Sequence, residues 1–256
     1  MAHPLQVLAA SFIAAGVLAA STTARADDPQ ISESERAKIE SVVHDYIMAH
    51  PEVVLDSLKA MQARQQAAED DRVRDTIAQE SDALRHAKGD FVAGNPKGDV
   101  TLVEFFDYNC TYCRQAASSI QSLLADDPKL RIIFKEWPIR GDDSMAATRV
   151  SLAAQGQPQF LAFHFALMKH PGKVDEAVAL QAAHDAGLDM TALKKAMQSP
   201  DIDARLAQTG TLAQKIGLQG TPAFVVGDEI IPGAVSEAEF RKLIAETRAS
   251  CSGPSC

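Results

Sequence analysis

Two cysteines separated by two residues carry the strongest chemical signal in this chain. Cys110 and Cys113 follow an apolar run, Val100 to Phe106, and precede a stretch of helical periodicity that begins at Thr111. The pair therefore lies where a buried strand ends and a helix begins. The first N–H groups of a helix lack intrahelical partners and carry partial positive charge, so they stabilise a thiolate. We expect a lowered pKa at Cys110, the attacking residue, with Cys113 placed to resolve a mixed disulfide.

A CxxC motif also occurs in zinc sites and in structural disulfides. A zinc site needs two further ligands, and the sequence has neither a second CxxC nor a histidine pair at ligand spacing near the first. A disulfide that closes so short a loop stabilises a fold very little. We therefore predict redox function without a metal or a cofactor. Six histidines are expected at the surface or at helix ends: His44, His50, His86, His164, His170 and His184.

The N-terminal residues predict export. Val7 to Ala20 is apolar with a single polar interruption, and Ala24 to Ala26 then forms a small-residue cleavage pattern. This is typical of a secretory signal peptide over residues 1–26, cleaved after Ala26. No later segment reaches the roughly 20 apolar residues of a membrane helix. We expect a soluble, periplasmic protein in a compartment where disulfides persist.

The charge balance limits the classes of partner. The chain has 34 acidic residues against 25 Lys and Arg, with a formal net charge of −9. Such a surface does not attract nucleic acid or anionic membranes. Together with export, the CxxC motif indicates unfolded or misoxidised secreted proteins as substrates, and a membrane redox partner that recharges the site.

Residues 27–88 have a helical composition, since Ile31 to Ala87 contains no glycine and one proline. Two predicted helices, separated at Pro51, carry apolar faces that need either the downstream domain or another chain as a partner. These faces are Ile39, Val42, Val43, Tyr46 and Ile47, then Val54, Leu55, Leu58 and Met61. Ala63 to Ala87 is charged, which favours a solvated linker over a helix that meets copies of itself. Its large aliphatic residues are Val73, Ile77 and Leu84.

Residues 89–249 carry the pattern of an α/β domain. Two buried strands flank a helix, which predicts a βαβ unit with parallel strands. A wholly helical stretch at about 142–217 follows, and a Gly-Asp turn then joins two short strands in a hairpin. The predicted strands and helices outside the insertion are Val100 to Phe106, Thr111 to Ala125, Leu130 to Phe134, Ala223 to Val226, Glu229 to Ile231 and Ser236 to Ala249.

Three features in this order resemble the DsbA-like branch of the thioredoxin superfamily: FFDYNCTYC at Phe105 to Cys113, the helical insertion, and GTPAFVVG at Gly220 to Gly227. The resemblance covers about residues 90–249 and implies a thioredoxin fold with a helical insertion. The preceding helical segment is similar to the oligomerising segment of ScsC-type periplasmic isomerases. That similarity implies a homo-oligomer, with a trimer favoured.

The resemblance also implies roles for single residues. Pro222 is expected to follow a cis peptide bond beside the CxxC motif, where Thr221 holds an extended substrate strand. A trans proline that starts a strand is the alternative. Glu104 and Lys135 are expected to meet beneath the motif as a buried pair that relays the proton of Cys113, or as a structural ion pair.

The residues between the cysteines tune the redox couple and face the substrate. Thr111 and Tyr112 replace the Pro-His pair of strongly oxidising members, so the resemblance implies a less oxidising potential. Together with Thr221 and the oligomer, this favours a disulfide isomerase or reductase. A dithiol oxidase that uses the same residues is the alternative, and a metal-handling or chaperone-like binding protein is the non-enzymatic one.

The C-terminal tail, residues 250–256, carries two more cysteines, Cys251 and Cys256. In an oxidising compartment we expect them to form a small terminal disulfide. A soft metal such as Cu(I) is an alternative occupant of two thiolates.

Overall fold

The computed structural model describes residues 31–250, which fall into two units divided between Met61 and Gln62. The predicted signal peptide, residues 1–26, and the tail cysteines Cys251 and Cys256 lie outside the described residues. Within residues 31–250, no helix combines the length and the apolar character needed to cross a membrane.

The first unit consists of α1 (Glu33–Ala49) and the beginning of α2 (Glu52–Gln79). A capping box starts α1, because the Ser32 hydroxyl accepts from the Glu35 N–H while the Glu35 carboxylate accepts from the Ser32 N–H. No residue of α1 is buried, and the predicted apolar faces of both helices are exposed. This unit has no core of its own, so its apolar side chains need a partner outside it.

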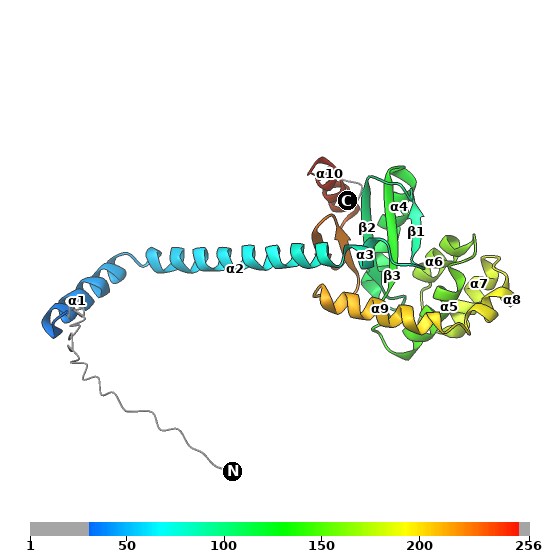
Figure 1. Ribbon diagram of the computed structural model, residues 1–256, viewed down its shortest axis with the longest axis horizontal. Coiled ribbons are helices and arrows are strands. Elements are labelled where there is room, and N and C mark those ends of the chain that lie inside the picture. The colour runs from blue at the N-terminus through cyan, green and yellow to red at the C-terminus, as the bar shows by residue number, and fades with distance from the viewer. Residues whose placement is uncertain (1–30, 251–256) are drawn as a thin grey trace, which may run out of the picture. The chain divides into compact units, whose positions relative to one another are not determined.

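The second unit is built on a five-stranded sheet in the order β1-β3-β2-β4-β5 (Figure 1). β2 and β3 are parallel and are joined by α4 (Thr111–Asp126), whereas the other neighbours are antiparallel. The predicted βαβ unit and closing hairpin are both confirmed. The strands are β1 (Phe91–Gly94), β2 (Val100–Phe106), β3 (Leu130–Glu136), β4 (Ala223–Val226) and β5 (Glu229–Pro232).

The edge strand β1 is not predicted by the sequence pattern. It has four residues and ends at Gly94, whose φ of 74° lies in the left-handed region. A Cβ atom at this position would lie 2.5 Å from the Leu130 carbonyl oxygen, so the close approach of β1 to β3 requires glycine. A four-residue strand that ends in glycine has too little alternation of apolar and polar residues to be recognised from the sequence.

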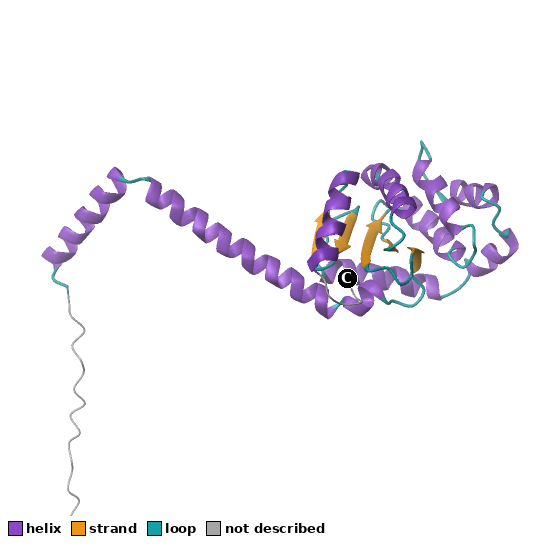
Figure 2. Ribbon diagram, turned by 90° about the horizontal axis from the view of Figure 1, so that it is seen from above, coloured by secondary structure: helices purple, strands orange, loops and turns teal. Residues whose placement is uncertain are grey.

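The helices of the insertion follow β3, as predicted, and the last helix follows β5. α6 contacts α4, α5 contacts α7, α8 and α9, and α9 contacts β3. Figure 2 shows the helices of this unit around the strands. The helices are α3 (Ser81–Arg85), α5 (Asp142–Ala154), α6 (Phe160–Lys169), α7 (Glu176–Asp185), α8 (Met190–Ala196), α9 (Asp201–Lys215) and α10 (Glu237–Ser250).

The sheet separates two apolar clusters. Phe106, Phe134 and Phe224 belong to the cluster that includes side chains of α4, α6 and α10. The other cluster holds Val103, Phe105, Ile133 and Val225 with side chains of α2, α3 and α9. Alternation along each strand sends successive side chains to opposite faces, which explains this division.

The linker prediction for Ala63 to Ala87 is wrong for its C-terminal part. Ile77 and Leu84 are fully buried in the second cluster, and Val73 packs against it. Each fully buried aliphatic side chain stabilises the fold by about 2 kcal/mol. Ile77 and Leu84, together with the partly buried Val73, dock this helical stretch on the sheet.

Candidate functional site

The CxxC motif lies at the junction of β2 and α4, as predicted. Cys110 is the N-cap residue of α4, with φ −85° and ψ 117°, and its carbonyl oxygen accepts from the Arg114 N–H at 3.1 Å. Cys113 lies in the first turn, and both cysteines are buried free thiols. Thr111 and Tyr112 are exposed. The residues between the cysteines are thus the part of the motif that an approaching polypeptide meets.

Cys110 is the more acidic thiol. Its pKa falls from 9.0 to about 5, and the largest cause is a hydrogen bond from the Cys113 side chain. Burial opposes the shift, whereas the backbone N–H groups of Cys113 and Tyr112 lower the pKa further. These N–H groups belong to the first turn of α4 and have no intrahelical acceptors. Cys110 is therefore a thiolate near neutral pH.

The same contact acts in the opposite direction on Cys113. Burial raises the pKa of Cys113 most, and the hydrogen bond to Cys110 and the negative charges of Cys110 and Glu104 raise it further. Cys113 therefore holds its proton while Cys110 is a thiolate. The motif combines a nucleophile and a protonated partner within one turn of helix.

The loop before β4 brings Thr221 and Pro222 to the motif. β4 pairs antiparallel with β2, and Ala223 lies opposite Phe105 near the end of that strand. The Thr221–Pro222 peptide bond is cis, as the resemblance implies. In its thiol form Cys110 donates from Sγ to the Thr221 carbonyl oxygen, with 3.1 Å between the two atoms. The register of the sheet thus places these residues beside the attacking sulfur.

The predicted pairing of Glu104 with Lys135 is wrong. In the parallel register of β2 and β3, Glu104 lies opposite Phe134, and Lys135 lies opposite Phe105. Side chains at opposed positions share a face of the sheet, so Glu104 and Lys135 point to opposite faces. The sequence pattern places both residues near strand ends but does not reveal the register, which decides the faces.

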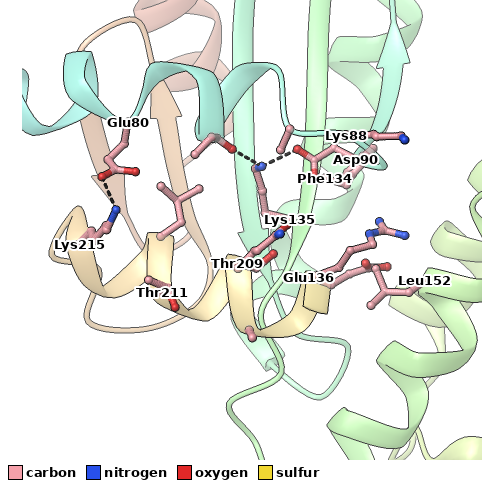
Figure 3. Close-up of a pocket in the computed structure, with 16 residues that line it drawn as sticks. Glu80, Lys88, Asp90, Phe134, Lys135, Glu136, Leu152, Thr209, Thr211 and Lys215 are labelled. Carbon is pink, nitrogen blue, oxygen red and sulfur yellow. Dashed lines mark hydrogen bonds and ion pairs between the residues drawn. The ribbon is translucent and has the colours of Figure 1, made fainter. Parts of the chain in front are cut away.

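Lys135 has a different partner. Its Nζ donates to the Asp90 carboxylate at 2.5 Å and to the Ala83 carbonyl oxygen at 2.6 Å, as the dashed lines in Figure 3 show. Burial lowers the pKa of Lys135 and raises that of Asp90. The pair lines a cavity of about 340 Å³, which α9 also lines through Thr209 and neighbouring residues. This ion pair is structural and does not reach the cysteines through Glu104.

Glu104 lies on the face of the sheet that carries the motif. It is 1% exposed, and its Oε1 has no hydrogen-bond partner among residues 31–250. Burial raises its pKa to about 8, and the negative charge of Cys110 adds to the shift. At neutral pH Glu104 is therefore mostly protonated, and its charge is coupled to both sulfurs.

Asp107 is a site residue to which the sequence pattern gives no role. It is fully buried, between β2 and the motif. Its carboxylate accepts from the N–H groups of Asn109 (2.7 Å), Ile139 (2.8 Å) and Arg140 (2.9 Å) and from the Ser144 hydroxyl (2.8 Å). It thereby ties the motif to the loop after β3 and to the start of α5. An Asp two residues before an Asn, directly ahead of a helix, is the turn signal that indicates this arrangement.

A buried hydrogen-bond network continues from Tyr108. The Tyr108 hydroxyl lies 2.7 Å from the Ser151 hydroxyl and 3.0 Å from His164 Nδ1. The Glu136 carboxylate accepts from Ser151 at 2.5 Å and from Gln155 at 3.0 Å. His164 is 1% exposed, which corrects its predicted surface position, and burial lowers its pKa to about 3. The neutral His164 side chain on α6 thus anchors Tyr108, which lies two positions before Cys110.

Two family models match the chain. Residues 101–245 match the DSBA-like thioredoxin domain, and residues 35–68 match the copper resistance protein ScsC N-terminal domain. The first match covers the sheet from β2 onward, the CxxC motif and the helical insertion. The second covers most of α1 and the first half of α2.

Two solved structures and one curated protein are similar to parts of this chain. A thioredoxin-like oxidoreductase from Silicibacter pomeroyi DSS-3 is 44% identical with a TM-score of 0.64, over 66% of this chain and 98% of that one. The catalytic domain of Proteus mirabilis ScsC is 30% identical with a TM-score of 0.64, over 69% and 99%. The Na(+)/H(+) antiporter NhaA 3 of Salinispora tropica is 30% identical over 139 residues, or 54% of this chain and 21% of the antiporter.

The present chain thus spans about a fifth of the length of that antiporter, whereas it covers nearly all of both solved structures. More than half of the chain matches one family model, and the matched residues hold the motif, the loop with the cis proline and the insertion. The protein belongs to the DSBA-like thioredoxin family.

Proposed function

We propose that the protein is an exported thiol-disulfide oxidoreductase that acts on secreted proteins, chiefly as a disulfide isomerase or reductase. The observation that carries the thiol-disulfide exchange is the unequal acidity of the two thiols, whereas Thr111, Tyr112 and Thr221 favour an isomerase or reductase over an oxidase. The pKa of Cys110 is about 5, and that of Cys113 is raised. A thiolate beside a protonated thiol is the arrangement that disulfide exchange needs.

The chemistry proceeds through a mixed disulfide. The Cys110 thiolate attacks one sulfur of a substrate disulfide, so a bond forms between Cys110 and the substrate while the other substrate sulfur leaves as a thiolate. In isomerisation, a substrate thiolate attacks the mixed disulfide and releases Cys110 without net redox change. In reduction, Cys113 loses its proton and attacks Cys110, which leaves a Cys110–Cys113 disulfide and a reduced substrate.

We propose that Glu104 alone, without Lys135, accepts the Cys113 proton. While Cys110 is a thiolate, its charge helps to keep Glu104 protonated. In the mixed disulfide Cys110 is neutral, so this contribution vanishes and the pKa of Glu104 falls. Glu104 then loses its own proton to solvent more readily, so more of it is in the carboxylate form that can accept the Cys113 proton.

Thr221 and Pro222 are the proposed docking residues for the substrate backbone, with Thr111 and Tyr112 at the rim. The Thr221 carbonyl oxygen is within hydrogen-bond distance of the attacking sulfur. A substrate strand that pairs with this backbone brings its disulfide to Cys110. The exposed side chains of Thr111 and Tyr112 border the same surface.

A dithiol oxidase is the second candidate, because one observation favours it. The lowered pKa of Cys110 stabilises the reduced form of the motif, which makes its disulfide easier to reduce and thus a stronger oxidant. The Thr-Tyr pair between the cysteines, in place of Pro-His, argues in the other direction. Redox poise therefore decides between the two candidates.

Two assays on the full chain decide between them. Reduced protein that recovers activity from scrambled ribonuclease supports the isomerase. Oxidised protein that rapidly oxidises a dithiol peptide, with no recovery in the first assay, supports the oxidase. A Cys110→Ala variant is the control in both assays, and activity equal to the unmodified protein in that variant contradicts catalysis by the motif.

The N-terminal unit is the proposed oligomerisation segment, with three copies of the chain per assembly. Its support is the exposed apolar face on α1 and early α2 together with the ScsC N-terminal match over residues 35–68. The large exposed apolar residues of this unit are Ile31, Ile39, Val42, Val43, Tyr46, Ile47, Met48, Val53, Val54, Leu55, Leu58 and Met61. Burying such a face between copies removes it from water.

Periplasmic location and the C-terminal disulfide stay predictions, because residues 1–30 and 251–256 lie outside the described part. Sequencing the N-terminus of the protein purified from a cell envelope fraction tests cleavage after Ala26. Within residues 31–250, no group of three or more His, Cys, Asp or Glu side chains is placed to hold a metal ion.

A further inference from the structure

Exposed apolar side chains of the second unit lie around the motif. Among residues 62–250, the exposed large apolar residues are Tyr112, Ile139 and Met145, at 59%, 41% and 39%. Tyr112 is within the motif, the Ile139 N–H donates to Asp107, and Met145 lies in the first turn of α5. The surface around Cys110 therefore offers apolar contacts to a polypeptide.

Arg140 adds a positive charge to this surface. Its Nη2 lies 4.0 Å from the Cys110 Sγ, and its backbone N–H donates to the Asp107 carboxylate at 2.9 Å. The side chain is exposed and has no ion pair with a carboxylate among residues 31–250. The nearby Asp143 pairs with Lys173 instead. Asp107 thus positions the backbone of Arg140. The polar partner of the Arg140 guanidinium is the attacking sulfur of Cys110.

The partner of Arg140 changes during the reaction. Before attack, the guanidinium faces a Cys110 thiolate. After attack, the negative charge leaves with the departing substrate sulfur, and Cys110 is neutral in the mixed disulfide. The guanidinium then lies next to substrate residues with no anion to pair with. A carboxylate on the substrate beside the bonded cysteine supplies that anion.

We propose that Arg140 is a specificity-determining residue, which favours substrate segments with an acidic residue next to the reacting cysteine. This inference rests on the proposed function of the CxxC motif. The reacting step needs no other reagent: the Cys110–substrate bond forms, the substrate disulfide breaks, and the departing sulfur takes the electron pair. Because Arg140 is exposed, the preference is modest, about two- to fivefold in rate, and decreases with added salt.

The test uses two cysteine peptides that differ in one residue. Each peptide has an aromatic residue on one side of the cysteine and either Glu or Gln on the other, and each is activated as a mixed disulfide with 2-thiopyridine. This leaving group is uncharged, so it does not itself pair with Arg140. Release of 2-thiopyridone by the reduced full chain gives the second-order rate constant for each peptide.

We expect the unmodified protein to prefer the Glu peptide. Arg140→Ala reduces the ratio of the two rate constants to about one, and Arg140→Glu inverts it. Arg149→Ala is the matched control and should keep the ratio unchanged, because Arg149 lies on α5 and pairs with Asp203. Thermal unfolding of each variant shows whether the fold is retained.

Two outcomes separate the failure of this inference from failure of the proposed function. If Arg140→Ala and the unmodified protein have the same ratio, Arg140 does not select acidic substrates, although the motif still reacts. If Cys110→Ala releases 2-thiopyridone from both peptides as fast as the unmodified protein, the motif is not the reacting group. A ratio that stays constant at high salt also contradicts recognition of the carboxylate by charge.

Discussion

The side chains of Cys110 and Cys113 share one hydrogen bond, and this bond makes their acidities unequal. The contact is the largest cause of the lowered pKa of Cys110, and it raises the pKa of Cys113. The N–H groups at the start of α4 also lower the pKa of Cys110, but their effect is smaller than that of the Cys113 side chain. Reactivity at this site therefore depends on the cysteine spacing itself as much as on the place of the motif in the fold.

Alkylation of Cys110 by iodoacetamide tests this assignment. The rate should rise with pH through about 5 and stay constant above it, because the thiolate is the reacting form. Cys113→Ala removes the contact that stabilises the Cys110 thiolate most. In that variant the midpoint of the alkylation rate therefore moves to higher pH. Mass spectrometry of quenched samples gives the rate. A midpoint near 9.0 in the unmodified protein contradicts the assignment.

Replacement of Glu104 tests its role in resolving the mixed disulfide. Glu104→Gln removes the proton acceptor, so attack by Cys113 slows on the order of a hundredfold, while alkylation of Cys110 continues. Trapping with acid and measuring the lifetime of a peptide adduct gives the rate. Lys135→Met is the control, because Lys135 lies on the opposite face of the sheet and pairs with Asp90. Equal slowing in both variants contradicts the role of Glu104.

The attacking and resolving cysteines were predictable from the sequence, but the partner of the buried carboxyl was not. Glu104 stands out as a charge in an apolar strand, and Lys135 as a charge at the end of another. Their pairing requires side chains on the same face, which depends on strand register. The sequence contains no signal that sets this register to one residue, so Asp90 could not be identified as the partner.

At the level of elements, β3, α5 and α6 meet in the network of Glu136, Ser151, Tyr108 and His164. Burial raises the pKa of Glu136 to about 7, and the hydrogen bond from Ser151 opposes part of that shift. The network reaches Tyr108, two residues before Cys110. The helical insertion is thus connected to the strand that leads into the motif by buried polar contacts as well as by packing.

The stability of this network should depend on pH. The folded state keeps a proton on Glu136 up to about 7, whereas the unfolded chain loses it near 4.5, so stability falls as pH rises between these values. Glu136→Gln removes that loss and gains about 3 kcal/mol relative to the unmodified protein between about pH 4 and pH 8. Urea unfolding across this range measures the difference.

Ser151→Ala provides the opposite change. It removes a hydrogen bond that lowers the pKa of Glu136, so the decrease in stability should continue to higher pH than in the unmodified protein. Parallel stability profiles for Glu136→Gln and the unmodified protein contradict the raised pKa.

The elements themselves follow the sequence pattern where apolar residues repeat clearly. β2, α4, β3, the insertion and the closing hairpin are all predicted. Helix α2 differs, because its part beyond Ala63 has only two large aliphatic residues, Val73 and Ile77. So sparse a pattern fits both a solvated helix and a docked one. Both residues pack in the cluster on the sheet face that carries Phe105 and Ile133, and this tertiary contact overrides the local composition.

At the scale of the whole molecule, the two units differ in how their apolar surface is used. In residues 62–250 it is buried in two clusters, apart from the few side chains around the motif. In residues 31–61 it is exposed along both helices. An isomerase benefits from several reduced motifs held near one misfolded substrate, because linked sites raise the effective concentration.

One substitution in the N-terminal unit tests this association. Leu58→Asp places a carboxylate on the apolar face, where burial between copies is unfavourable. We expect light scattering to change from three chains per particle to one, while the alkylation rate of Cys110 and the unfolding of residues 62–250 stay unchanged. Recovery of scrambled ribonuclease should decrease, because separate motifs no longer act on one substrate. Ala63→Asp adds the same charge on the opposite, exposed side of α2 and should leave both mass and recovery unchanged, whereas equal masses for Leu58→Asp and the unmodified protein contradict association through this face.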